Sequence, residues 1–78
     1  MITSDQIRAA RALLRWSSSD LAERSGIGSA TIKRLEVMKG VPSGHINTLL
    51  SIKSTLENAG LEFIGTPEKG AGVRFKDH

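Results

Sequence analysis

The chain has 78 residues, of which 38% are hydrophobic and 24% are charged, and it contains no cysteine. From this length we expect one small domain without a second, catalytic domain, and the lack of cysteine excludes disulfides and cysteine-ligated metal sites within this sequence. A domain of this size buries only about 60% of the surface of its unfolded chain, so we expect support from a partner subunit.

The formal net charge is +3, and the whole excess lies in the first half of the chain. Residues 1–40 hold seven lysines and arginines against four acidic residues, whereas residues 41–78 hold four of each kind. This asymmetry is typical of a protein in which one half meets a polyanion and the other has a different role. No segment has the composition of a signal peptide or a membrane span, so we expect a cytoplasmic protein without a membrane partner.

Start and stop signals predict two helices in the first third of the chain. The first helix covers about residues 4–15, because Thr3 and Gln6 have the spacing of a capping box and apolar residues follow at helical spacing. A second helix of about eight residues follows the start signal at 17–20 and ends at Gly26, a residue that adopts a positive φ at little cost.

Two further helices are predicted before the composition changes. The third covers about residues 29–37, with Ile32 and Leu35 on its buried side. The fourth is the longest: it opens at residue 43, places His45 on the surface of its first turn and ends at Gly60.

After Gly60 the apolar residues alternate with polar ones, which is the period of a strand. Segments 61–64 and 73–76 alternate in this way and are separated by a stretch rich in glycine and proline, so we expect a β-hairpin with a loop of seven or eight residues. An isolated hairpin is marginal in water, so its apolar side chains must pack on the helices of the same chain or on a second copy. We favour a homodimer in which the hairpin forms the interface through Leu61, Phe63, Ile64, Val73 and Phe75.

The stretch 17–36, SSSDLAERSGIGSATIKRLE, closely resembles the helix-turn-helix of the Xre, Cro and lambda-repressor-like family of bacterial and phage DNA-binding proteins. Ala22, Gly26, Ile32 and Leu35 stand where this family has alanine, glycine and two branched aliphatic residues. Two helices that cross over a short turn need a small side chain at the crossing and a glycine at the corner, which Ala22 and Gly26 supply.

The resemblance covers about residues 3–59 and implies a mainly α fold. This fold is a lambda-repressor-like bundle of four to five helices, followed here by the C-terminal β-hairpin. Residues 1–60 then form the helix-turn-helix DNA-binding domain, and residues 61–78 form a hairpin of the same domain that serves dimerisation or partner binding.

By the same resemblance, the third helix enters the major groove of double-stranded DNA. The residues that then face the bases are Ser29, Ala30, Lys33 and Arg34. The residues implied to lie near phosphates, at the start of the second helix and around the third, are Ser17, Ser18, Ser19, Thr31 and Lys39.

Two further positions take structural roles from the resemblance. In the family an acidic residue at the position of Glu36 pairs with an arginine of the first helix, which corresponds to Arg11, so we expect a partly buried ion pair between them. The family often has glycine where Arg15 stands, so either Arg15 holds an unfavourable positive φ or the loop takes a different course.

These features predict a sequence-specific DNA-binding transcriptional regulator that acts as a homodimer on a short operator. The alternative is a protein-binding module on the same fold, either an antiactivator or a toxin-neutralising antitoxin, with little or no DNA binding. We expect no enzymatic activity, cofactor or metal site, because the only histidines, His45 and His78, have no nucleophile or carboxylate at a recognisable spacing.

Overall fold

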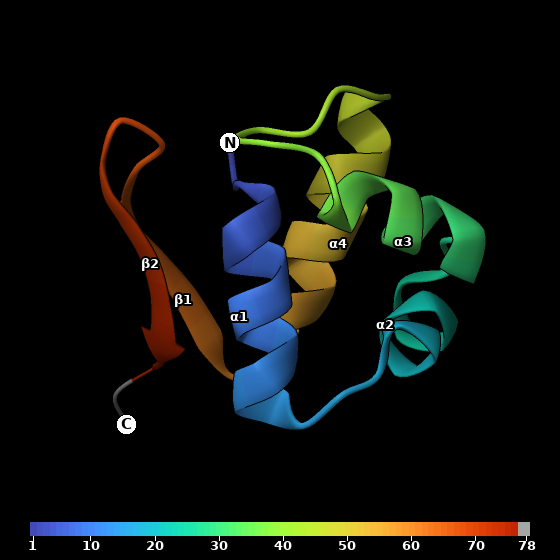
Figure 1. Ribbon diagram of the computed structural model, residues 1–78. Helices are drawn as coiled ribbons and strands as arrows, with labels where there is room; N and C mark the ends of the chain where they lie inside the picture. The colour runs from blue at the N-terminus through green and yellow to red at the C-terminus, as the bar shows by residue number, and fades with distance from the viewer. Residues whose placement is uncertain (77–78) are drawn as a thin grey trace.

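A computed structural model describes residues 1–76 of the chain, and the expectation for His78 lies outside the described residues. The helices are α1 (Ser4–Leu14), α2 (Ser18–Ser25), α3 (Ser29–Glu36) and α4 (Ile46–Asn58), and the strands are β1 (Leu61–Thr66) and β2 (Lys69–Phe75). The strands pair as a two-stranded antiparallel hairpin beside α1 (Figure 1). This small α+β fold has the four helices and the C-terminal hairpin predicted from the sequence.

The side chain of Gln6 fixes both the start of α1 and the position of the hairpin. In the predicted capping box, the Gln6 backbone N–H donates to Thr3 Oγ1 at 3.0 Å, and the Thr3 N–H donates to Gln6 Oε1 at 2.8 Å. The other end of the same amide, Nε2, donates to the Gly72 carbonyl oxygen of β2 at 2.8 Å. One buried amide therefore stabilises the helix terminus and holds β2 against α1.

At the end of α1, Arg15 has a positive φ, which was one of the two alternatives expected from the sequence. Arg15 has φ 57° and ψ 38°, and it is the only residue other than glycine within residues 1–76 that has a positive φ. In this left-handed conformation a Cβ crowds the backbone, at a cost of about 1–2 kcal/mol. The exposed Arg15 side chain therefore occupies a position better suited to glycine.

The fourth helix begins three residues later than predicted. His45 has the extended conformation of an N-cap (φ −69°, ψ 130°) and precedes the first turn rather than lying in it. The loop before His45 contacts the start of α1: the Ser4 N–H donates to the Gly40 carbonyl at 2.9 Å. Pro42 of the same loop is buried. The Gly40 carbonyl is thus bonded to the start of α1 and not within a helix.

The hairpin loop is much shorter than predicted. Both strands continue through the glycine-rich stretch, so that only residues 67–68 form the turn. Gly65 and Gly70 make this possible with positive φ values of 74° and 69°, and a Cβ at Gly65 would clash with the Gly70 carbonyl oxygen. The prediction of a seven- or eight-residue loop was wrong because these glycines lie within the paired strands, where the register is irregular, and not in a loop.

The hydrophobic core combines the N-terminal segment, all four helices and β1. Its fully buried members are Ile2, Ile7, Ala10, Leu21, Ile32, Leu35, Leu49, Ile52, Leu56 and Leu61. Leu61 is 1% exposed, and Phe63 and Val73 pack against the same core, whereas Ile64 and Phe75 are exposed. Of the five residues expected at a dimer interface, Leu61 is therefore enclosed within its own chain, and Ile64 and Phe75 remain accessible.

No helix within residues 1–76 has the length and apolar character needed to cross a lipid bilayer.

We expect Arg15→Gly to stabilise the protein, because glycine removes the Cβ that makes the left-handed conformation unfavourable. The free energy of unfolding should rise by about 1 kcal/mol in urea denaturation. The matched control is Arg15→Ala, which removes the same charge and keeps the Cβ, and which should give no such gain. Equal stability of the two variants would contradict the assignment of strain to Arg15.

Candidate nucleic-acid interface

The start of α2 is closed by a reciprocal capping box. The Asp20 N–H donates to the Ser17 hydroxyl oxygen at 3.0 Å, and the Ser17 N–H donates to Asp20 Oδ2 at 2.8 Å. Hydrogen bonding by the Ser17 backbone, and then by its hydroxyl, lowers the pKa of Asp20 below its ordinary value, with a further contribution from the charge of Arg24. The Asp20 carboxylate therefore stays ionised at the helix end where a phosphate was expected.

The three serines expected near a phosphate thus differ in what they offer. The Ser17 side chain is engaged in the cap, Ser18 is half-buried, and Ser19 is exposed. The N–H groups of the first turn of α2 still carry partial positive charge. The neighbouring Asp20 carboxylate offsets part of that charge, so the attraction of this helix end for an anion is reduced.

The turn between α2 and α3 is short, and a glycine stands at its first position. Gly26 ends α2 with φ 75°, and its N–H donates to the Ala22 carbonyl at 3.0 Å. Ile27 then packs against the core, and α3 begins at Ser29, directly after Gly28. Gly28 has no side chain with which to cap α3, so the first N–H groups of this helix have no side-chain acceptor from the N-cap.

The two sides of α3 have different characters. Ile32, Leu35 and Glu36 are buried, whereas Ala30, Lys33 and Arg34 are exposed. Figure 1 places α2 and α3 on the side of α1 and α4 opposite to the hairpin. Three of the four residues expected to face DNA bases therefore lie together on one open helical face.

The remaining predicted positions lie at the margins of this face. Ser29 and Thr31 are half-buried, and Lys39 is exposed in the loop that follows α3. None of the four ion pairs within residues 1–76 involves Lys33, Arg34 or Lys39. The positive charge around α3 is therefore not neutralised by a neighbouring carboxylate.

The acidic residue of α3 is turned inward by an ion pair with α1. Arg11 Nε and Nη2 donate to the two carboxylate oxygens of Glu36, each at 2.7 Å, in a bidentate geometry. A third donor, Arg11 Nη1, reaches the Trp16 carbonyl at 3.0 Å, and these bonds to Glu36 raise the pKa of Arg11. The Glu36 side chain is only 7% exposed. The structure thus contains the pair expected from the sequence, and it removes one carboxylate from the surface beside Lys33.

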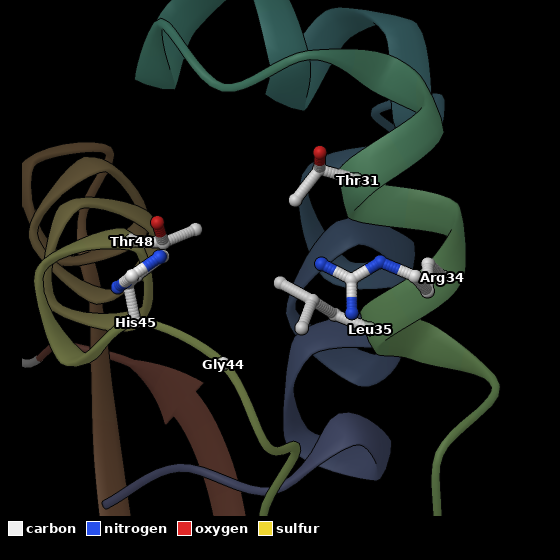
Figure 2. Close-up of a pocket in the computed structure, with 6 residues that line it drawn as sticks. All are labelled: Thr31, Arg34, Leu35, Gly44, His45 and Thr48. Carbon is white, nitrogen blue, oxygen red and sulfur yellow. The ribbon is translucent and has the colours of Figure 1, made fainter.

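A cleft next to this face was not anticipated from the sequence. It has a volume of about 490 Å³ and lies between α3 and the start of α4 (Figure 2). Its lining comprises Thr31, Arg34, Leu35, Gly44, His45 and Thr48. The only sequence signal for this cleft was the spacing of Thr31 and Arg34, which places them one helical turn apart on the same side of the third helix. The sequence does not predict that His45 and Thr48 line this cleft, because it places the start of the fourth helix at residue 43.

Comparison with known proteins adds no relative to this description: no protein-family model matches the chain, and no curated protein matches it. Within residues 1–76, no group of three or more side chains is arranged to hold a metal ion. The interpretation of the site therefore depends on the geometry of α2 and α3.

We expect Glu36→Ala to destabilise the protein strongly, because it leaves the Arg11 guanidinium partly buried without its carboxylate. The loss of free energy of unfolding should be about 3 kcal/mol, measured by thermal melts or urea denaturation. Glu62→Ala, which breaks an exposed pair with Arg74, is the control and should cost no more than about 1 kcal/mol. A loss below about 0.5 kcal/mol for Glu36→Ala, the size of an ordinary surface substitution, would contradict the structural role of the pair.

The capping box of α2 predicts a pH dependence. The pKa of Asp20 is lower in the folded chain, so its contribution to stability is present above the unfolded value of about 3.9 and is lost as the pH falls through the folded value. Asp20→Asn keeps a side-chain acceptor but no charge. It should be less stable than the parent at pH 7, and in urea denaturation this difference should shrink as the pH falls below the unfolded value. A difference that stays constant over this range would show that the charge of Asp20 does not stabilise the cap.

Proposed function

We propose that this protein is a sequence-specific DNA-binding transcriptional regulator of the Xre, Cro and lambda-repressor-like kind, and that α3 reads the major groove. One observation carries the proposal: the outward face of α3 presents Lys33 and Arg34 without an ion-pair partner in residues 1–76, while Glu36 of the same helix is turned inward. A helix of this kind suits the major groove, which admits an α-helix and displays a distinct pattern of donors and acceptors for each base pair.

The side chains of α3 that we propose to face the bases differ in the contacts that they can make. Arg34 donates two hydrogen bonds to O6 and N7 of a guanine, which is the commonest specific contact. Ala30 offers an apolar contact to a thymine methyl group, and Ser29 bonds to several bases. Lys33 lies beside them as a further cation. This combination gives modest specificity centred on the base pair met by Arg34.

Contacts to the DNA backbone fix the position of α3 in the groove. Lys39 and Thr31 flank the helix, and the first turn of α2 supplies backbone N–H groups from Ser18 and Ser19. Because Asp20 weakens the attraction at α2, we assign the larger part of the phosphate affinity to Lys39.

We propose that the protein binds DNA as a homodimer, because one chain carries a net charge of only +3. Two copies place two recognition helices about 34 Å apart, in successive major grooves on one side of the duplex. Each α3 must then lie about 17 Å from the two-fold axis, within the 30 Å long dimension of the chain. We propose that the exposed Ile64 and Phe75 of the hairpin contribute to this contact.

One observation favours the alternative of a protein-binding module, either an antiactivator or an antitoxin. Ile46 and Leu50 lie one turn apart on α4 and are 60% and 45% exposed. Apolar side chains gathered on a surface are typical of a site for another protein. The DNA-binding experiment separates this alternative from the first proposal.

The decisive experiment is selection of bound duplexes from a random library, followed by a salt titration on the best site. We expect an enriched sequence and a linear decrease of log K against log salt, with a slope of about −0.9 for each phosphate contacted. Arg34→Ala should reduce discrimination at one base pair by about 1–3 kcal/mol. Lys39→Ala should weaken binding to all sequences alike.

The control is Lys53→Ala, which removes the same charge from α4 on a residue that pairs with Glu57, and which should leave DNA binding unchanged. Light scattering of the complex should give two chains for each duplex. Weak binding without any enriched sequence would contradict the regulator and favour the protein-binding module.

A further inference from the structure

The cleft between α3 and α4 brings together polar side chains that lie far apart in the sequence. Thr31 and Arg34 come from α3, whereas His45 and Thr48 come from the start of α4. Figure 2 shows the Arg34 guanidinium extending from α3 toward Thr48 and His45. The arrangement depends on the loop that holds His45 in place as the N-cap of α4.

The chemistry of the lining favours an oxyanion. Arg34 offers a planar fork of N–H donors that matches phosphate oxygens, and the imidazole and the two hydroxyl groups add further donors. No acidic residue lines the cleft, and α4 has none in its first turn. An anion placed here therefore meets several donors and no nearby like charge from the lining.

The size of the cleft points to a ligand larger than an inorganic ion. A volume of about 490 Å³ falls within the range of sites that hold small organic molecules, which begins at about 300 Å³. Leu35 also lines the cleft although it is 1% exposed, and Gly44 beside it adds backbone without a side chain. These features leave room for an organic group beside the bound oxyanion.

We propose that this cleft binds a small phosphomonoester, with its phosphate held by Arg34, Thr48, Thr31 and His45. Its regulatory consequence rests on the proposed DNA-binding function. A phosphate held by Arg34 and Thr31 withdraws both side chains from the DNA, so the ligand and the operator compete for them. The phosphomonoester thereby acts as an effector that lowers the affinity for DNA.

The test follows the amide resonances of Thr31 and Thr48 by NMR during titration of the full chain with ribose 5-phosphate, inorganic phosphate and ribose. We expect ribose 5-phosphate to bind with a dissociation constant below about 1 mM, inorganic phosphate to bind more weakly, and ribose to leave both resonances unchanged. The same protein is titrated separately with its selected DNA duplex, or with random duplex if none is selected.

Thr48 provides the discriminating variants, because the proposed DNA contacts do not use it. Thr48→Val keeps the shape and should weaken ribose 5-phosphate at least tenfold without changing DNA affinity, and Thr48→Ser should restore binding. Arg34→Gln should weaken both ligands. The charge control Lys53→Gln should change neither, and thermal melts establish that each variant is folded.

The outcomes separate the two proposals. Binding of ribose 5-phosphate that depends on Thr48 supports the cleft even if the protein binds no DNA. DNA binding without any response to ribose 5-phosphate overturns the cleft proposal and leaves the regulator intact. If Thr48→Val instead weakens DNA alone, the cleft receives a backbone phosphate and the effector site is wrong. Equal weakening by Lys53→Gln would show nonspecific anion binding and would also overturn the proposal.

Discussion

The ion pair between Arg11 and Glu36 sets both the orientation and the charge of α3. Because one guanidinium binds both carboxylate oxygens, the pair opposes rotation of α3 about its own axis. Turning the helix far enough to expose Glu36 would also bring Ile32, which lies on the same side one turn earlier, toward water. The outward face of α3 is therefore fixed by a polar contact and a hydrophobic contact that act together. Removing the carboxylate from that face leaves Lys33 and Arg34 as its charged residues.

The small size of the chain explains why single side chains serve two purposes. The Gln6 amide completes the capping box of α1 and also bonds to a carbonyl of β2. Leu61 begins the hairpin and is at the same time a fully buried member of the helical core. A two-stranded hairpin has little stability of its own, so these contacts join it to the helices as one folding unit. The hairpin thus acts first as part of the fold, and only its exposed residues remain for a partner.

Much of the fold could be predicted because its signals are local. The capping boxes that begin with Thr3 and Ser17, and the terminal glycine Gly26, act within one helical turn, and each lies where the sequence placed it. A positive φ at Arg15 was one of two alternatives expected from the sequence, and it is the one observed. The start of α4 was misplaced: the preceding segment is bonded through the Gly40 carbonyl to Ser4, a long-range contact that a local pattern does not reveal. The hairpin loop was overestimated because glycine is equally compatible with a loop and with an irregular strand.

The sequence by itself determined the number of helices, their approximate limits and the apolar sides that form the core, because capping and periodicity act between near neighbours. The resemblance led us to expect the pair of Arg11 and Glu36, but only the tertiary structure decided its bidentate geometry and its burial, because the two residues lie 25 residues apart. It also decided that Leu61 belongs to the core of its own chain while Phe75 is exposed. The cleft that joins Arg34 to His45 and Thr48 has the same origin, because two helices must meet in space before their side chains can form one site.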